Sequence, residues 1–451
     1  MTKDIQISKG AEINIKGSAE KILTDIPSVN SYAIKPENFF NFTPKMLVKE
    51  GEEVSIGTPI CFEKNDSRII LVSPVSGIVN KITRGDRRKI LEIIIEPDSS
   101  NKKISHKVEK IQSLNPEKIK KFLLKTGSWP FIRQRPFNVF ADPDITPRSI
   151  HISTISSAPL GVDYDFILKN NKEDFQLGIN ILNTLLPGKV NLFVDKDFQG
   201  FFSKIKNANI FRISGPHPSG NVSVQIQKTN PINFGDKVWV IRPEDIVNIA
   251  ILFSTGIYSC KRTLAISGSS VSNPQYFKTN IGSNLSSILK KLNIDPSIQN
   301  RYINGDVFSG IEVQKDGHID FFNNLVSVIP EGNKYRFFGW VPFFHNKIPS
   351  LSRTSFSWLF GRKGYNVDTN LNGEERALVV TGEMEKVFPM DIYPMQLIKA
   401  CMAGDIEKME GLGIYEVIPE DFGLIDYSNT SKIEAQEIIK EGIELMIKEI
   451  A

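Results

Sequence analysis

The chain has 451 residues, of which 40% are hydrophobic and 24% are charged. This length exceeds that of one ordinary domain, and the composition is sufficient for packed cores. Its 55 basic and 51 acidic residues give a net charge of +4. Such an even balance lacks the concentrated basic footprint that is typical of nucleic-acid binding. We therefore expect no nucleic-acid partner.

The cysteines and the hydropathy pattern indicate the compartment of the protein and its relation to the membrane. Cys61, Cys260 and Cys401 are far apart, odd in number and never part of a CxxC pair, which predicts a reducing compartment and no disulfide framework. Three thiols are also too few for an all-cysteine iron–sulfur cluster. The start of the chain is charged, so we expect no secretory signal. No apolar run approaches the ~20 residues of a membrane span, and we expect any membrane contact to go through partners or a surface patch.

The first hundred residues are predicted to form short strands. Over residues 40–97, alternating apolar residues surround Gly51 and Gly57 and lead into a hairpin and a Pro-Val-Ser-Gly-Ile-Val segment. The pattern resembles the barrel-sandwich fold of biotinyl and lipoyl domains. In those domains a modified lysine lies at the hairpin tip, which falls here near Lys64. The Met-Lys-Met and Asp-Lys-Ala signatures are missing, so we interpret the tip as a plain exposed turn on a scaffold domain.

Strands and helices alternate in the next part of the chain. Strands are predicted over 149–155, 190–194 and 210–213, and helices over 116–125, 175–186, 201–205 and 243–253. This alternation favours a parallel α/β layer. No G-x-G-x-x-G, Walker A, HExxH or GxSxG motif is present. The α/β region therefore carries no dinucleotide fingerprint, and we do not assign NADH binding to it.

The rest of the chain changes character twice. Residues 262–313, with one helix over 285–292, suggest a β-grasp-like module, and aromatic strands are predicted over 335–344. Helices follow over 395–403, 406–412 and 433–450, the last with amphipathic spacing. The predicted fold class is multidomain α/β. Its parts are a barrel-sandwich hybrid domain (1–100), a Rossmann-like α/β domain (101–258), a β-grasp module of SLBB type (259–330), and a strand segment with a helical C-terminal region (331–451).

One segment contains several residue types that commonly bind ligands. Between Trp129 and Phe137 the chain alternates arginines with aromatic residues and prolines. On an extended stretch, residues i and i+2 point to the same face, so the guanidiniums of Arg133 and Arg135 should lie together. Two such donors can recognise a phosphate or a carbonyl-rich ring, with the aromatic side chains as stacking surface. Alternatively, the arginines pair with acids such as Asp142 and Asp144.

A second candidate is His217, in the segment Ser-Gly-Pro-His-Pro-Ser-Gly. It directly follows a predicted strand, and loops at the carboxyl ends of strands are where ligands bind in α/β sheets. The residue is either a ligand or partner contact, or a hydrogen-bonded histidine in a rigid turn. The five histidines share no metal-ligand spacing, so no metal site is predicted.

Four segments, taken in order, resemble one family: VSGIVNKITRGDRRKILEIIIE, GSWPFIRQRPF, ISGPHPSG and EMEKVFPMDIYPMQL. They are similar to the A subunits of Na⁺-translocating NADH:quinone reductases, from about residue 5 to about residue 420. The resemblance implies a peripheral subunit on the cytoplasmic face of a bacterial inner membrane. With five other subunits it would pass electrons from NADH to ubiquinone and export Na⁺.

The same resemblance implies that the chain binds no redox cofactor and is not catalytic alone, while the complex uses NADH, flavins, iron–sulfur centres and ubiquinone. It also implies kinship with the C subunit of Rnf complexes and the flavin-binding NADH subunit of respiratory complex I. The A subunit is implicated in quinone binding. The expected quinone-proximal residues are Trp129, Phe131, Arg133, Arg135, Pro136, Phe137 and His217.

The chain departs from this family near its end. Where the family commonly has a Cys-Pro-Gly/Ser-Lys-Tyr segment, this chain has residues 422–432, which contain no cysteine. The contacts of that segment are therefore in doubt. Two rival functions are an Rnf-type flavoprotein subunit, which the lack of a CxxCxxC run disfavours, and a barrel-sandwich carrier modified on Lys64.

Overall fold

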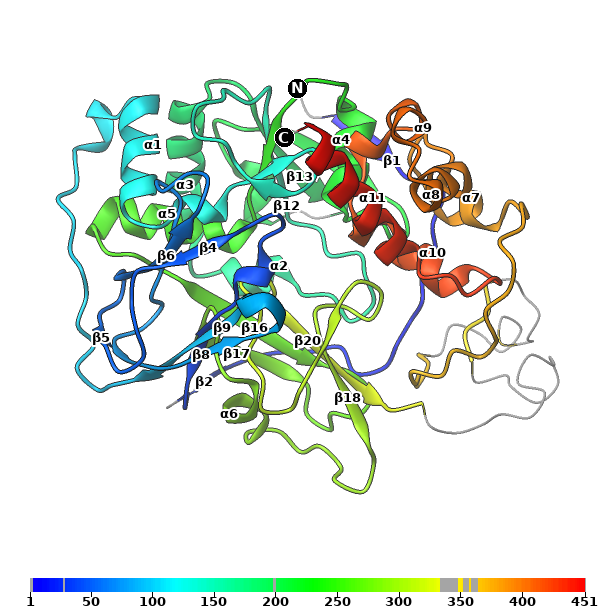
Figure 1. Ribbon diagram of the computed structural model, residues 1–451, viewed down its shortest axis with the longest axis horizontal. Helices are drawn as coiled ribbons and strands as arrows, with labels where there is room; N and C mark the ends of the chain where they lie inside the picture. The colour runs from blue at the N-terminus through cyan, green and yellow to red at the C-terminus, as the bar shows by residue number, and fades with distance from the viewer. Residues whose placement is uncertain are drawn as a thin grey trace.

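The computed structural model describes residues 3–26, 29–197, 200–332, 348–351, 357 and 364–450. Three strand-rich parts make up most of the chain, and a group of helices at the end of the chain covers one side of the molecule (Figure 1). The strands predicted over 335–344 lie outside the described residues. Among the described helices, none is long and apolar enough to cross a membrane.

A seven-stranded sheet forms the α/β part. Its middle strands are parallel, and two short antiparallel strands close one edge. The order across the sheet is β1 (Lys3–Gln6), β14 (Asn209–Ser214), β13 (Val190–Asp195), β12 (Ile150–Ser153), β15 (Val238–Val240), β10 (Arg133–Arg135) and β11 (Val139–Phe140). The predicted parallel α/β layer is thus present, and the three strands predicted for it, now β12, β13 and β14, begin and end within three residues of the predicted positions.

Helices cover both faces of this sheet. α1 (Pro116–Lys125), α3 (Lys172–Leu185) and α5 (Pro243–Thr255) lie together on one side (Figure 1). α3 and α5 can approach closely because a Cβ on Gly178 would lie 2.4 Å from a side-chain carbon of Ile246. The short helices α2 (Tyr164–Leu168) and α4 (Val222–Thr229) follow strands β12 and β14 along the chain. The helix predicted over 201–205 is a 3-10 turn, Phe201–Lys204.

The barrel-sandwich part has two small antiparallel sheets. One contains β3 (Tyr32–Ile34), β9 (Ile90–Pro97), β8 (Gly77–Arg84) and β5 (Glu53–Val54), and the other contains β4 (Pro44–Met46), β6 (Pro59–Glu63) and β7 (Ile70–Val72). Their inward side chains, such as Ile60, Val79 and Ile93, are fully buried. Lys64 is exposed in the turn between β6 and β7, as the sequence predicts.

The third sheet belongs to the β-grasp-like module. Its order is β19 (Ile311–Val313), β18 (Asn300–Asn304), β20 (Leu325–Pro330), β16 (Lys261–Ser267), β17 (Gln275–Asn280) and β2 (Glu20–Asp25), with the short helix α6 (Leu285–Leu289) packed on it. Two strands from the start of the chain therefore lie outside the barrel-sandwich sheets, because β1 extends the α/β sheet and β2 extends the sheet of the β-grasp-like module. The predicted boundary of 1–100 places both strands in the barrel-sandwich domain, where they do not pair. Short, isolated strands carry no sequence signal for the sheet they join.

The end of the chain is helical, as predicted. The helices are α7 (Glu383–Val387), α8 (Pro394–Ala403), α9 (Ile406–Gly411), α10 (Gly423–Ser428) and α11 (Ala435–Ile450). α8 and α11 pack against each other and share a core with the α/β sheet, where Phe193 and Val238 meet Leu397 and Ile439. The segment 422–432 is part of this core. Phe422 is fully buried, 5.0 Å from the ring of Phe388.

A buried ion cluster ties the α/β part to the β-grasp-like module. Arg262 on β16 lies 2.9 Å from Asp245 and 3.6 Å from Glu244, both in the first turn of α5. All three side chains are at most 6% exposed. The two carboxylates raise the pKa of Arg262 above its ordinary value in spite of burial. Removing one partner from such a cluster leaves an uncompensated charge in the interior.

We predict that Arg262→Met lowers the free energy of unfolding by about 3–5 kcal/mol, because Glu244 and Asp245 lose their cation. Chemical denaturation followed by tryptophan fluorescence measures this change. Arg68→Met is the matched control: Arg68 pairs with Asp66 and Asp144 near the surface, and exposed pairs contribute about 0–1 kcal/mol. Equal stability of the two variants would contradict the structural role of the cluster.

Candidate functional site

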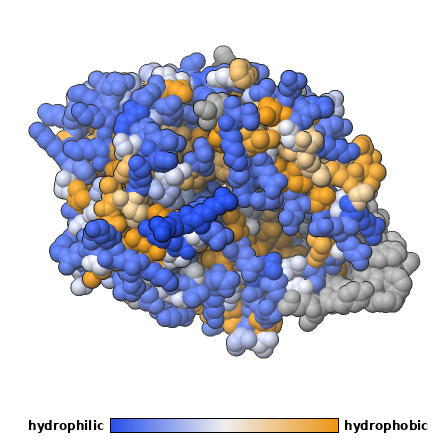
Figure 2. Space-filling model, in the orientation of Figure 1, coloured by the Kyte–Doolittle hydropathy of each residue, from blue (hydrophilic) through white to orange (hydrophobic). Residues whose placement is uncertain are grey.

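A cleft of about 1170 Å³ lies where the parts of the molecule meet. Figure 2 shows the hollow near the centre of this face. The walls come from all four parts: segments 35–44 and 87–90 of the barrel-sandwich, 153–158, 220–223 and 240–243 of the α/β part, 309–313 and 322–325 of the β-grasp-like module, and 418–421 near the chain end. Ligand pockets are usually about 300–1,000 Å³, so this cleft can hold a cofactor-sized molecule.

The cleft opens at the carboxyl ends of two parallel strands. β12 ends at Ser153 and β15 ends at Val240, and both of these residues line the cleft together with Ile155 and Ile241. Ligands bind at this edge of open α/β sheets. The expectation that ligands bind at the carboxyl ends of parallel strands therefore points to the edge of the sheet at which the cleft opens.

Three arginines reach the same region of this cleft. Arg133 and Arg135 on β10 both line it, as expected for residues i and i+2 of a strand, and Arg242 follows β15. The guanidinium of Arg133 lies 4.5 Å from the ring centre of Phe322, and that of Arg242 lies 5.9 Å from the same ring. Arg242 also donates a hydrogen bond to the carbonyl oxygen of Phe322. Phe322 thus holds two cations in position.

Arg135 is the most enclosed of the three. It is 3% exposed, and among the described residues its Nε and Nη1 atoms have no hydrogen-bond partner. Burial lowers the pKa of Arg135, and Asp421 and Glu420 oppose this shift. Burial likewise lowers the pKa of Arg133, with the charges of Arg242 and Arg135 adding to the effect. A guanidinium stays protonated in proteins, so the cost of burial remains unless an anion offsets it.

Asp421 is a buried acid whose charge acts on Arg135. Burial, together with the charge of Glu420, raises the pKa of Asp421 to about 6, and Arg135 opposes that shift. The carboxylate accepts hydrogen bonds from the Ile418 backbone N–H at 3.0 Å and from the Asn221 side chain at 3.2 Å. Asp421 is thus fixed by the chain end and by the cap of α4 while its charge acts on Arg135.

The remaining residues of the arginine segment do not line the cleft. Trp129 is fully buried, packs edge-on against Trp239 at 5.4 Å, and donates from Nε1 to the Ala141 carbonyl at 2.7 Å. Phe131 is 1% exposed and stacks on Tyr258 at 6.0 Å. Both belong to the core that joins the α/β sheet to the barrel-sandwich.

Pro136 and Phe137 turn the chain away from the cleft. Pro136 is buried and follows a cis peptide bond, and Phe137 has a φ of +75°. The ring of Phe137 lies 5.7 Å from that of Tyr415, in the core shared with the C-terminal helices. Of the predicted residues in this segment, only Arg133 and Arg135 border the cleft. Contact between any of them and a quinone stays a prediction.

His217 has partners that match the rigid-turn interpretation. It is 6% exposed, its Nδ1 lies 3.1 Å from the Ser157 hydroxyl, and its ring stacks on Phe308 at 5.2 Å. Its carbonyl accepts from the Ala11 N–H at 2.9 Å. Burial lowers the pKa of His217. The residue packs behind the cleft wall and does not line it.

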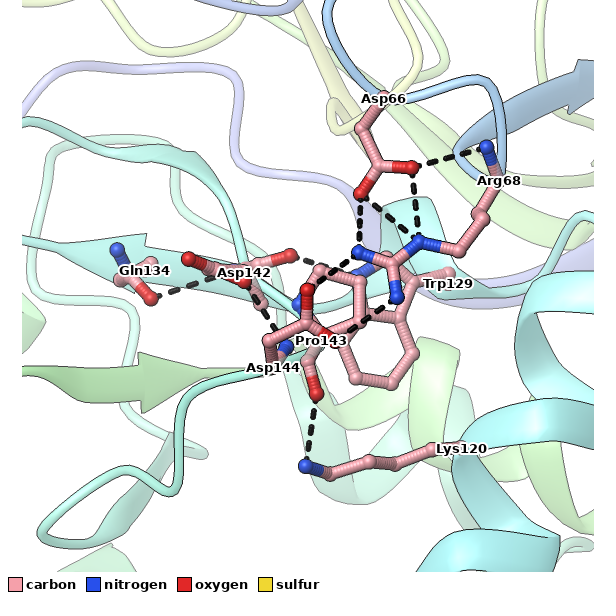
Figure 3. A network of polar contacts seen from close by, with 9 residues as sticks. Asp66, Arg68, Lys120, Trp129, Gln134, Asp142, Pro143 and Asp144 are labelled. Carbon is pink, nitrogen blue, oxygen red and sulfur yellow. Dashed lines mark hydrogen bonds and ion pairs between the residues drawn. The ribbon is translucent and has the colours of Figure 1, made fainter. Parts of the chain in front are cut away.

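The alternative that the arginines pair with Asp142 and Asp144 is wrong. Asp144 instead accepts two hydrogen bonds from Arg68, which also binds Asp66, while Lys120 reaches the Pro143 carbonyl (Figure 3). This network links the barrel-sandwich to the α/β part beside Trp129. Together with the packing of Trp129 and Phe131 in the core between these two parts, the network shows that this region connects the barrel-sandwich to the α/β sheet.

Sequence reasoning missed several cleft residues. Arg242 directly precedes the predicted helix over 243–253, but the strand before it, β15, was not predicted, so the strand-end rule could not be applied there. Phe322 and Asp421 carry no local signal, because they reach the cleft only through packing of distant segments. Among the described residues, no group of three or more His, Cys, Asp or Glu side chains is placed to hold a metal, and the three cysteines are free thiols.

The class that this arrangement defines is a multidomain α/β protein with an interdomain ligand cleft. Three family models match its parts: the NqrA N-terminal barrel-sandwich hybrid domain at residues 5–98, the NqrA second alpha/beta domain at 114–258, and the NQRA C-terminal domain, of SLBB type, at 263–315.

Whole-chain relatives extend the match. The chain is 31% identical to the A subunit of the Na(+)-translocating NADH-quinone reductase of Haemophilus influenzae, and equally to that of Pasteurella multocida. Each match covers 99% of this chain and all of the relative. A chain of a NAD⁺-reducing [NiFe]-hydrogenase aligns over 71% of this chain and 63% of its own with a TM-score of 0.37 and 12% identity, which is too low to carry an argument. The chain belongs to the family of A subunits of Na⁺-translocating NADH-quinone reductases, and it is a subunit of an enzyme complex.

We predict that Trp129→Ala destabilises the chain by about 3–5 kcal/mol, because it removes a fully buried ring. Trp129→Phe should cost less, since the ring packing largely remains and only the hydrogen bond to Ala141 is lost. Urea denaturation of the isolated chain measures both. If Trp129→Ala is as stable as the wild-type chain, Trp129 is not part of the core, and the expectation that it contacts a ligand would again have to be tested.

Proposed function

We propose that this chain is a peripheral, cofactor-free subunit that assembles with five others into a Na⁺-exporting NADH:ubiquinone reductase and borders the path of the quinone. Family membership over the whole chain supports the assignment to the complex. The single observation that carries the quinone proposal is the cleft lined by Arg133, Arg135 and Phe322. NADH oxidation, flavins and iron–sulfur centres belong to other subunits in this proposal, which also includes the inferred kinship with Rnf and complex I subunits.

The chemistry of the cleft suits a quinone headgroup. A quinone presents two carbonyl oxygens that accept hydrogen bonds and a flat ring that needs apolar contact. Arg135 lines the cleft, two of its buried nitrogens have no hydrogen-bond partner among the described residues, and Phe322 and Tyr164 supply aromatic surface in the same cleft. Pockets that combine many apolar atoms with a few fixed polar groups are the usual form of small-molecule sites. An isoprenoid tail would leave through the cleft mouth toward a membrane subunit.

The position of the chain in the complex is part of the proposal, and its surface supports a contact with partner subunits. We place it on the cytoplasmic face, held by partner subunits. Large apolar side chains are exposed on and beside the C-terminal helices: Val379 at 61%, Val380 at 63%, Tyr393 at 67% and Met402 at 61%. Figure 2 shows apolar residues on this side of the molecule. Exposed apolar patches commonly mark contacts with other proteins, and this one is a candidate surface for assembly.

We predict that Arg135→Gln in the assembled complex raises the apparent KM for quinone about ten- to a hundredfold. Losing one hydrogen bond from a charged donor costs roughly 1.5–3 kcal/mol, which corresponds to that change in affinity. NADH oxidation by an artificial acceptor should be unchanged. Arg376→Gln is the matched control, because Arg376 is exposed and does not line the cleft. Unchanged quinone kinetics in an intact complex would exclude the quinone role, and dissociation of the complex would identify a contact between subunits.

The cofactor proposal has a separate test. We predict that the chain, purified alone, has no absorption band in the visible range and no stoichiometric flavin, iron or zinc. Visible spectroscopy and metal analysis of the isolated chain measure this. One bound flavin per chain would contradict the proposal and favour an Rnf-type flavoprotein, whereas a lipoyl or biotinyl mass on Lys64 would favour a carrier.

A further inference from the structure

The arginines of the cleft form a cationic group with unsatisfied donors. Arg133, Arg135 and Arg242 line the same cavity, and the charge of each affects at least one other. Arg135 leaves two nitrogens without a hydrogen-bond partner among the described residues, although it is only 3% exposed. Buried polar groups without partners are rare in proteins and call for a ligand, water or functional reason.

The acids nearby do not complete this group. Glu244 and Asp245 are already paired with Arg262, which leaves Glu420 and Asp421 to face the three arginines. Asp421 is held by the Ile418 N–H and by Asn221, and no ion pair links it to Arg135 among the described residues. Asp421 and Glu420 therefore offset only part of the cost of burying Arg135, and Nε and Nη1 of Arg135 keep no hydrogen-bond partner among the described residues.

A helix start adds to the positive potential. The cap and first residues of α4, Asn221 to Ser223, line the cleft, and the first turn of α4 carries no acidic residue. Unpaired backbone N–H groups and the helix dipole favour anions at such an end. By contrast, the first turn of α5 carries Glu244 and Asp245, so α4 is the end suited to an anion.

The mouth of the cleft is basic as well. Arg84, Arg87, Arg88 and Lys89 come from the hairpin between β8 and β9, are exposed, and line the cleft. Figure 2 shows strongly hydrophilic residues crossing the edge of the hollow. Charges of one sign around a cleft raise the local concentration of the oppositely charged ligand and speed its entry. A neutral quinone gains nothing from this arrangement.

We propose that the cleft binds a phosphate-bearing molecule, with its phosphate on Arg133, Arg135 and Arg242 at the start of α4. A phosphate presents three acceptor oxygens and up to two negative charges, which match several guanidinium donors better than a carboxylate with two oxygens. The cleft is much larger than a phosphate ion, so the remaining volume accommodates an organic portion against Tyr164 and Phe322. Because Arg135, Phe322 and Tyr164 are also the residues proposed above to border a quinone, the phosphate-bearing molecule is an alternative occupant of the same cleft, and its binding does not depend on a quinone role for the chain.

Calorimetric titration of the full isolated chain with inorganic phosphate and, separately, with AMP tests the proposal. At low ionic strength we expect one saturable site per chain. Tighter binding of AMP identifies an organic phosphate as the ligand class, and equal affinity identifies the free anion. Arg135→Gln should weaken both at least tenfold. Because the assay contains no quinone and no other protein of the complex, failure of the quinone proposal leaves its outcome unchanged.

A second variant keeps the test independent of core packing. Arg87→Gln combined with Arg88→Gln changes exposed side chains only and should weaken phosphate binding severalfold, with the difference shrinking at high salt. The matched control is Lys107→Gln combined with Lys110→Gln, an equal charge change at exposed residues outside the cleft. Either of two results overturns the proposal: no saturable phosphate binding by the wild-type chain, or the same affinity in the cleft variants and the control.

Discussion

The charge balance between Arg135 and Asp421 is the constraint on which the central cleft depends. Arg135 lies on the antiparallel edge of the α/β sheet, and Asp421 comes from the chain end. Each is almost fully enclosed, at 3% and 2% exposure. A lone buried charge is costly, and the charges of Arg135 and Asp421 each offset part of the cost of burying the other. The fold of the last third of the chain is thereby linked to the geometry of the cleft.

The segment 422–432 contributes to this link. It contains α10 and adds Phe422 to the shared core. Gln436 donates to the Phe308 carbonyl at 2.9 Å, and the ring of Phe308 lies against His217 and Tyr427. The segment therefore packs by apolar contact and hydrogen bonds. These contacts hold residues 418–421 at the wall of the cleft.

Much of the architecture could be predicted because its signals are local. The alternation of strands and helices identified the parallel sheet, and glycine-punctuated short strands identified the barrel-sandwich. The i, i+2 rule placed Arg133 and Arg135 together, and both line the cleft. The sequence could not predict pairing between distant strands. β1 and β2 pair with strands more than two hundred residues away along the chain. No pattern within four or six residues specifies such a partner.

The same reason limited prediction of the site. The arginines, aromatic residues and prolines between Trp129 and Phe137 indicated a candidate site, but strand alternation alone could not predict which of these residues face a cleft. Trp129 and Phe131 pack behind it because the barrel-sandwich covers that side of the segment. Phe322 and Asp421 enter the cleft from elements whose placement depends on the packing of all four parts. Only the folded structure brings these side chains to the arginines.

A double-mutant cycle between Arg135→Gln and Asp421→Asn tests the charge balance most directly. The four proteins are compared by chemical denaturation of the isolated chain near neutral pH, where Asp421, with a pKa of about 6, is mainly charged. We expect the second substitution to cost less once the first is present, with a coupling energy of about 1–3 kcal/mol. Additive effects, with no coupling beyond about 0.3–0.5 kcal/mol, would contradict the link, because the chain end and the sheet edge would then be stabilised independently.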